Sequence, residues 1–476
     1  MAKARTRSRP SAGRRTEHDL LGPMTLPAKA LYGVQTARAI DNFRISGVPI
    51  SLYPDFIRAL AMVKLAAARA NHDTGALARK QLRAIEAGCA ALLESREHDH
   101  QFPVDMFQGG AGTSTNMNAN EVIANLGLAS LGLPPGSYQT LDPHDHVNLS
   151  QSTNDAYPTT LHVATLLGND RLVDSLRELV KAFRAKGRQF RNVIKMGRTQ
   201  LQDAVPMTLG QEFSAWAASI EGEIGALRAV ERLLCEVNMG GTAIGTGLNA
   251  PRRYAPACVR HLSRIVGKKF TLAPDLIEAT QDTQAFVVYH AVVRSLCVKL
   301  SKVCNDLRLL SSGPRAGLRE INLPAMQPGS SIMPGKVNPV IPEVVNQVCF
   351  KVIGNDLCVT LAAEAGQLQL NVMEPVIAQC IFESQTLLCN AVRTLRVYCV
   401  QGITANQDIC RGYVENSIGI VTALNPLIGY EKATQIAAEA LATGAGVVEL
   451  VRKHKLLTEA QIRTVLNPRA LTGQRR

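Results

Sequence analysis

Aromatic residues are scarce in this chain, at 4% of 476 residues, with Trp216 as the single tryptophan. Proteins that stack on nucleic-acid bases need aromatic platforms, and this composition gives no sign of them. No apolar run approaches the roughly 20 residues that cross a bilayer, and the first 15 residues lack the apolar segment of a secretory signal. The sequence therefore predicts a soluble, cytoplasmic protein with no membrane partner.

Cofactor and metal motifs are also missing. The eleven cysteines are odd in number, form no C-x-x-C pair and lie largely among apolar residues, which is typical of reduced core thiols. His144 and His146 have no third residue at a metal-ligand spacing. The segment GTGLNA at 245–250 fits a dinucleotide pattern, but a helical stretch precedes it and Pro251 follows it. We expect neither a metal site nor a nucleotide cofactor.

Charge is distributed unevenly along the chain. The formal net charge is +13, and six of the basic residues fall within residues 1–15, where there is no acid. Such a segment is typical of a solvated, disordered arm, and contact between this arm and nucleic acid is kept as a secondary hypothesis. The remaining chain keeps a mild positive excess, which favours anionic substrates.

Long helical periodicity dominates the middle of the chain, while the alternation typical of strands is sparse. Apolar residues recur at three- and four-residue steps in two clear stripes: Phe213, Trp216, Ile220, Ile224, Leu227, Val230 and Leu234, then Leu296, Leu300, Val303, Leu307 and Leu310. A chain with so few aromatics is expected to bury such stripes in a bundle, within itself or with other subunits. We predict a mainly α protein with a disordered tail (1–15), an N-terminal helical domain (16–150), a central long-helix bundle (151–405) and a small C-terminal domain (406–476).

The segment GSSIMPGKVNP at 329–339 concentrates chemistry in a stretch unsuited to a core. Two hydroxyls, Ser330 and Ser331, precede a cation, Lys336, and an amide, Asn338, while the glycines and prolines prevent a regular helix or strand. Such a loop offers free backbone N–H groups, an ammonium and a hydroxyl to an anionic small molecule. The alternative is an ordinary surface connection.

Three further clusters of short polar side chains lie between the expected helices. Taken singly, each has an alternative explanation as a helix cap. Taken together, they offer many neutral donors and few carboxylates, which suits a small dicarboxylate. Their candidate residues are Thr113 in QGGAGTSTNMN, Ser152, Thr153 and Asn154 in SQSTND, and Thr199 and Gln200 in MGRTQLQD.

The loop and these clusters resemble the aspartase/fumarase superfamily over nearly the whole chain, from HDLLG at 18–22 to NSIGIVTALNP at 416–426. Within it, the motifs look like the aspartate ammonia-lyase branch, because Gln200 stands where class II fumarases typically carry histidine. The resemblance implies reversible conversion of L-aspartate to fumarate and ammonia through an aci-carboxylate. It also implies a homotetramer whose long helices form a central core and whose active sites are shared between subunits.

The resemblance assigns a role to each candidate. Ser330 would be the general base that removes the Cβ proton. The β-carboxylate would be held by Thr113, Ser152, Thr153 and Ser331, the α-carboxylate by Thr199, Lys336 and Asn338, and the amino group by Asn154 and Gln200. No organic cofactor is implied, and activation by a divalent cation is left open. The alternatives are class II fumarase activity and a non-catalytic structural role.

Overall fold

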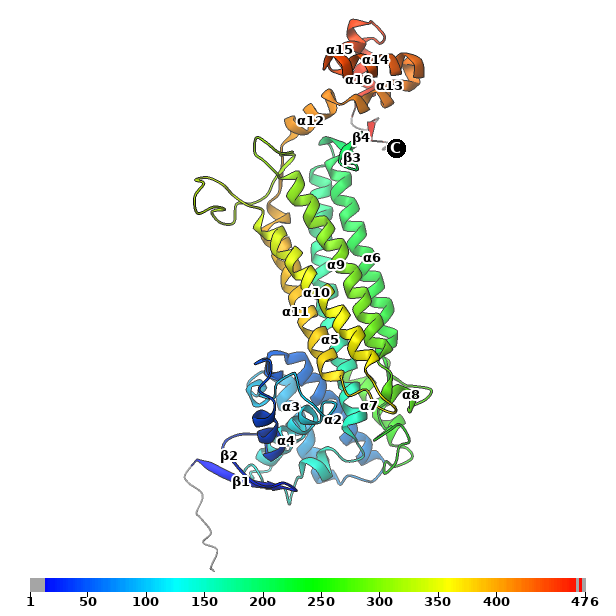
Figure 1. Ribbon diagram of the computed structural model, residues 1–476. Coiled ribbons are helices and arrows are strands. Elements are labelled where there is room, and N and C mark those ends of the chain that lie inside the picture. Colours follow the sequence, from blue (N-terminus) through cyan, green and yellow to red (C-terminus); the bar gives the residue numbers. More distant parts are fainter. Residues whose placement is uncertain (1–12, 468–470, 473–476) are drawn as a thin grey trace, which may run out of the picture. The chain divides into compact units, whose positions relative to one another are not determined.

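The computed structural model describes residues 13–467, Leu471 and Thr472, and its regular structure is mostly helical (Figure 1). This confirms the predicted mainly α class. Strands occur in the described residues only as two-stranded sheets. Three are antiparallel and one is parallel: β1 (Arg14–Asp19) with β2 (Gly22–Pro27), β3 (Ile194–Thr199) with β4 (Gln202–Thr208), β7 (Ile321–Asn322) with β8 (Thr404–Ala405), and, in parallel, β5 (Glu236–Val237) with β6 (Thr271–Leu272).

Five long helices account for the predicted periodic stripes: α5 (Thr153–Gln189), α6 (Leu209–Leu234), α9 (Gln284–Leu310), α10 (Val340–Glu364) and α11 (Glu374–Tyr398). All five residues of the α9 stripe are buried, and the α6 stripe is buried except at Ile224, which is half-buried. The three- and four-residue spacing therefore marks the faces that these helices pack inward.

The chain divides into two compact units. Unit 1 comprises the described residues up to 171 with 226–294 and 352–386, and unit 2 comprises 172–225, 295–351 and the described residues from 387 onward. Each of the five long helices contributes residues to both units. The four-part division expected from the sequence stays a prediction.

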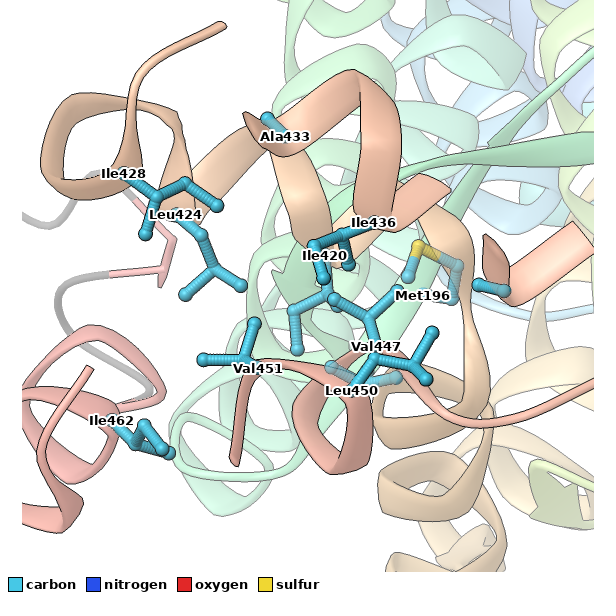
Figure 2. Packing of buried hydrophobic residues seen from close by; sticks show 12 residues of the cluster. Met196, Ile420, Leu424, Ile428, Ala433, Ile436, Val447, Leu450, Val451 and Ile462 are labelled. Atoms are coloured by element: carbon cyan, nitrogen blue, oxygen red, sulfur yellow. The ribbon is translucent and has the colours of Figure 1, made fainter. Parts of the chain in front are cut away.

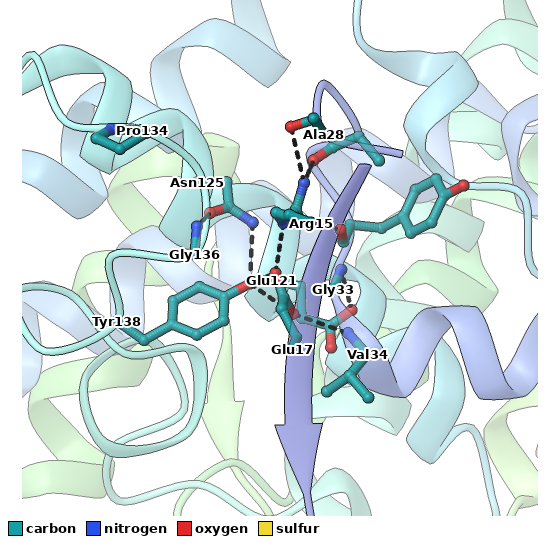
Figure 3. Close-up of polar contacts among 12 residues, drawn as sticks. Arg15, Glu17, Ala28, Gly33, Val34, Glu121, Asn125, Pro134, Gly136 and Tyr138 are labelled. Carbon is teal, nitrogen blue, oxygen red and sulfur yellow. Dashed lines mark hydrogen bonds and ion pairs between the residues drawn. The ribbon is translucent and has the colours of Figure 1, made fainter. Parts of the chain in front are cut away.

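The first strand of the described residues corrects one expectation. Residues 1–12 of the expected tail lie outside the described residues, but Arg14 and Arg15 belong to β1 rather than to a disordered arm. The Arg15 guanidinium donates to Ala28 O at 3.1 Å and pairs with Glu17 at 2.7 Å (Figure 3). Glu17 lies two residues away in β1 itself and Ala28 directly follows β2, so Arg15 is held by contacts that a count of basic residues does not reveal.

Unit 1 is built around α2 (Pro54–Asp73), which packs against α3 (Arg79–Glu94) and α7 (Tyr254–Val266), while α3 packs against α4 (Thr113–Ser130). Glycine permits the close approach of α3 and α4, because a Cβ at Gly88 would lie 2.5 Å from Ile123 O. The remaining short elements of this unit are α1 (Val34–Asn42), η1 (Ile50–Leu52), η2 (Asp99–Gln101), the π-helical turn η3 (Pro143–Val147) and α8 (Glu278–Gln281).

Unit 2 includes a cluster of short helices at the carboxyl end: η4 (Val400–Gly402), α12 (Gln407–Asn416), η5 (Ile418–Ile420), α13 (Val421–Ile428), α14 (Tyr430–Thr443), α15 (Val447–Lys453) and α16 (Glu459–Val465). Their shared core is apolar, and Met196 of β3 packs into it with Ile420, Val447 and Leu450 (Figure 2). The β3–β4 hairpin is therefore anchored to this helical cluster.

Helix α10 carries an exposed apolar stripe. Phe350, Leu357 and Leu361, spaced by seven and four residues, are 62%, 61% and 59% exposed. In the described part of the chain, α10 is the one helix whose length and composition would suffice to cross a membrane, with 39% of its most apolar window buried. Core helices of soluble proteins share these properties, and an apolar stripe with this spacing is also suited to contact with another helix.

Candidate active site

The segment 329–339 is an irregular loop between β7 and α10, as predicted. Two hydrogen bonds join the two ends of this loop. Gly329 N donates to Lys336 O at 2.7 Å, and Asn338 Nδ2 donates to Gly329 O at 2.7 Å. A Cβ at Gly329 would lie 2.6 Å from Lys336 O, so only glycine permits this closure. The Asn338 side chain thus closes the loop, which is a role additional to its predicted contact with substrate.

The Ser330 hydroxyl lies within this loop and accepts hydrogen bonds from two backbone groups. Ile332 N donates to its Oγ at 3.2 Å and Met333 N at 2.9 Å. Backbone N–H groups directed at an oxygen favour its negatively charged form. The local backbone therefore supplies part of the stabilisation that a serine alkoxide needs, while Ser331 and Lys336 remain exposed.

A cavity of about 500 Å³ adjoins the carboxyl end of this loop within unit 2. Lys336 and Asn338 line it together with two arginines, Arg308 and Arg319, that the sequence analysis did not select. Three cations against one carboxylate, Glu343, leave the lining of the cavity with a positive excess, which suits an anionic ligand. The sequence held a signal for Arg319, because this residue lies just after the Gly/Pro break at 313–317.

Thr199 and Gln200 lie at the tip of the β3–β4 hairpin, where Thr199 pairs with Gln202. Gln200 and Leu201 form the turn with φ angles of 54° and 63°, in the left-handed region that favours glycine or asparagine. Both predicted residues are exposed. A two-residue hairpin turn needs positive φ angles, which Gln200 and Leu201 adopt at some cost in backbone strain.

The other two clusters lie in unit 1, and each begins a helix. Thr113 is the first residue of α4 and Thr153 is the first residue of α5. Free N–H groups and the helix dipole make such ends favourable for a carboxylate. Thr113 does not itself cap α4, whose N-cap residue is Gly112, so the cap that the sequence suggested does not account for it.

The two helix ends are linked directly, because Asn116 of α4 donates from Nδ2 to Thr153 Oγ1 at 3.3 Å. Unit 1 therefore places the first turn of α4, which carries Thr113, beside Thr153 at the start of α5. Thr199, Gln200, Ser330, Ser331, Lys336 and Asn338 lie in unit 2. Convergence of all four segments stays a prediction.

The SQSTND segment is fixed by the buried carboxylate of Asp155. It accepts from Ser152 N at 2.9 Å, Gly240 N at 3.0 Å and Thr242 N at 2.9 Å, and burial raises its pKa to about 6 against the effect of these donors. Asn154 donates from Nδ2 to Ala243 O at 2.7 Å. The loop around 238–243 therefore belongs beside this cluster.

Sequence reasoning missed the 238–243 loop because that region was considered only for a dinucleotide motif. Thr242 has a φ of 56°, but backbone angles are not visible in a sequence. Another missed residue is Lys64, whose signal was present: a lysine inside the apolar run AMVKLAAA. Its side chain is fully buried.

No group of three or more metal-ligating side chains occurs in the described part of the chain. Within each unit, the candidate residues supply mainly hydroxyl and amide groups, joined in unit 2 by the cation of Lys336, and donors of this kind suit an anionic organic molecule.

A family model described as "Lyase" matches residues 22–354, and one described as "Fumarase C C-terminus" matches residues 420–473. The chain therefore belongs to this lyase family, the aspartase/fumarase superfamily, which confirms the resemblance seen in its loops. It is 59% identical to the aspartate ammonia-lyase of Pseudomonas canavaninivorans, over 98% of each chain. It is 56% identical to the aspartate ammonia-lyase of Escherichia coli strain K12, over 94% of each.

Solved structures show the same fold. A fumarate lyase:delta crystallin from Brucella melitensis, bound to cobalt, superposes with a TM-score of 0.92 at 53% identity, covering 96% of this chain and 98% of that one. A class II fumarase from Schistosoma mansoni superposes with a TM-score of 0.90 at 33% identity, covering 97% and 100%.

Proposed function

We propose that this chain is an aspartate ammonia-lyase, which converts L-aspartate reversibly to fumarate and ammonia. The observation that carries the proposal is the 59% identity to an aspartate ammonia-lyase over 98% of both chains. The residues expected to perform the reaction are all present, and Gln200 occupies the position at which the ammonia-lyase branch differs from class II fumarases.

In the proposed mechanism, Ser330 as an alkoxide removes a proton from Cβ of aspartate. The electron pair of the broken C–H bond moves into the β-carboxylate and gives an aci-carboxylate with two negative charges. Collapse of this intermediate forms the carbon-carbon double bond and expels ammonia from Cα. The two N–H groups on Ser330 Oγ support its role as the base.

Charge accumulates on the β-carboxylate as the proton leaves. We assign Thr113, Ser152, Thr153 and Ser331 to this group, supported by the helix ends at Thr113 and Thr153. Hydrogen bonds that strengthen with this charge lower the barrier as well as the dissociation constant.

We assign the α-carboxylate to Thr199, Lys336 and Asn338, with the basic cavity beside Lys336 in support. We assign the amino group to Asn154 and Gln200. Because the Asn154 amide nitrogen already donates to Ala243 O, its carbonyl oxygen is the atom suited to accept from a substrate ammonium.

The active unit in this proposal is a homotetramer with sites shared between subunits. The exposed stripe of Phe350, Leu357 and Leu361 on α10 supports it, because an apolar helix face of this spacing is suited to packing against other helices. We also propose that the enzyme is cytoplasmic, supported by its eleven cysteines, most of which are buried, as is typical of reduced core thiols. It needs no organic cofactor in this proposal, and activation by a divalent cation is tested by adding Mg²⁺ or a chelator.

The test follows fumarate by its ultraviolet absorbance after purified protein is mixed with L-aspartate or L-malate. We expect turnover of aspartate alone, and turnover of malate alone would instead establish a fumarase. Ser330→Ala should lower kcat by about a thousandfold, in the range typical of losing a general base. A Ser330→Ala variant that keeps more than about a tenth of the rate would overturn the assignment of the base.

A further inference from the structure

Lys64 occupies an unusual position for a charged side chain. It lies on α2 between apolar neighbours and is fully buried. Its ammonium donates to three amide oxygens: Asn116 Oδ1 at 2.6 Å, Asn148 Oδ1 at 2.9 Å and Gln151 Oε1 at 2.8 Å. An ammonium has three N–H donors, so this arrangement uses them all.

Burying this ammonium has a cost. Burial lowers the pKa of Lys64 to about 7, although Asp155 opposes the shift. An apolar side chain of similar size would avoid the free-energy cost of removing the ammonium from water. A lysine at this buried position therefore indicates a role other than packing.

The ammonium determines how the Asn116 amide is oriented. Because an ammonium can only donate, the oxygen of Asn116 must face Lys64 and its NH₂ must point the other way. That NH₂ donates to Thr153 Oγ1 at 3.3 Å and to Asn148 Oδ1 at 3.1 Å. The Thr153 oxygen therefore accepts from Asn116, and its hydroxyl proton is left to point elsewhere.

The same orientation is reinforced around Asn148. Its Oδ1 accepts from Lys64 at 2.9 Å and from Asn116 Nδ2 at 3.1 Å. Two helical turns along α2, Asn71 donates to Leu149 O at 2.7 Å and accepts from Ser150 Oγ at 2.7 Å. Helix α2 thus fixes the segment that leads into Thr153.

We infer that Lys64 is a positioning residue which, through Asn116, directs the Thr153 hydroxyl proton toward the β-carboxylate of the substrate. The chain of donors runs from Lys64 N–H to Asn116 Oδ1, from Asn116 N–H to Thr153 Oγ1, and from Thr153 O–H to the substrate. This inference rests on the proposed function, which assigns Thr153 to that carboxylate. A buried amide cluster that only stabilises the fold would not require this direction.

Asn116→Asp tests the direction while nearly preserving shape. The ionised carboxylate of this variant still accepts from Lys64, but it has no hydrogen to give, so the Thr153 hydroxyl turns inward and donates to it. We expect kcat for aspartate to fall by about tenfold to a hundredfold with a smaller change in KM, because the lost bond strengthens in the transition state.

Asn120→Asp is the matched control. It introduces the same charge on the same helix and removes the same kind of donor to Asn148 Oδ1, but the Asn120 amide nitrogen contacts Asn148 Oδ1 and Met117 Sδ rather than Thr153. We expect it to change kcat by less than about threefold, because the Thr153 hydroxyl keeps its direction. Circular dichroism and the melting temperature of both variants check that they fold.

A double-mutant cycle supplies the decisive readout. In a Thr153→Ala background, Asn116→Asp should cost little more, because the hydroxyl that it redirects is gone. An equal cost with and without Thr153 would overturn the inference, as would a folded Asn116→Asp enzyme with a rate within about threefold of the parent. If Asn116→Asp does not fold, Lys64→Met is measured in the same cycle and judged by the same criterion. A parent enzyme that turns over no aspartate would refute the proposed function instead.

Discussion

At the scale of single residues, Glu374 is a buried ionisable group of unit 1 whose protonation bears on stability. Glu374 begins α11 with its side chain 4% exposed, and burial raises the pKa of this carboxyl to about 8. The folded state therefore binds the Glu374 proton more tightly than the unfolded chain does, for which the ordinary value of 4.5 applies. The stability that this group contributes is complete below pH 4.5 and is lost as the pH rises to about 8.

Glu374→Gln should remove this loss. We expect the melting temperature of the variant, relative to the parent, to increase between about pH 5 and pH 8, with a gain of about 1 to 3 kcal/mol in unfolding free energy at the upper end. Urea unfolding at several pH values measures it. Glu431→Gln, at an exposed position on α14, is the control and should give a flat difference. A flat difference for Glu374→Gln would contradict the burial argument.

At the scale of elements, a buried charge cluster holds the β3–β4 hairpin. Glu320 is fully buried just before the loop that leads to Ser330. It pairs with Arg198 of β3 at 2.5 Å and with Lys195 of β3 at 3.0 Å, and Lys195 also pairs with Glu212 at 2.7 Å. Arg198 directly precedes Thr199 at the hairpin tip, and Glu320 lies before the chain segment that leads to Ser330. The charge cluster therefore links the hairpin tip to the start of that segment.

The Glu320→Gln variant removes one carboxylate from this cluster. Glu212 then remains as the one carboxylate beside the two cations, Lys195 and Arg198. We expect a loss of about 3 kcal/mol in unfolding free energy, as is typical when one partner of a buried pair is removed. The KM for aspartate should also rise, because Thr199 loses its support. Glu221→Gln breaks the exposed pair with Arg184 and should cost less than about 1 kcal/mol. Equal losses in the two variants would show that burial of the Glu320 pairs is unimportant.

Local sequence patterns anticipated the elements well. The stripes in α6 and α9 followed from periodicity, and the loop at 329–339 followed from its glycines and prolines. The patterns did not anticipate that Arg15 lies in a strand, because this strand is formed by pairing with β2, where the guanidinium contacts Glu17 and Ala28 O (Figure 3).

At the scale of the whole molecule, the stripe on α10 bears on assembly. An exposed phenylalanine and two leucines on one helix face leave apolar surface in water that a second copy would cover. Association through such a face is driven by the area removed from water, at about 25 cal/mol per Å².

Phe350→Asp should therefore weaken the proposed tetramer. We expect a lower molar mass by size-exclusion chromatography with light scattering, and a loss of activity in step with dissociation if active sites are shared. Leu441→Asp changes a residue of α14 that is 72% exposed, and it should leave both the mass and the rate unchanged. A Phe350→Asp protein with unchanged mass would place the subunit contact elsewhere.

The sequence by itself determined the helical class, the loop that carries Ser330 and the membership of the aspartase/fumarase superfamily. These follow from periodicity, from backbone restriction by glycine and proline, and from motif identity, which are all properties of neighbouring residues. The tertiary structure decided what surrounds those motifs: the 238–243 loop beside Asn154, the strained turn at Gln200 and the donor chain from Lys64 to Thr153. The first and last of these join residues distant in the sequence, and the turn takes its backbone angles from the hairpin that it closes. The partner of a buried polar group is set by which helices pack together, and no local pattern encodes it.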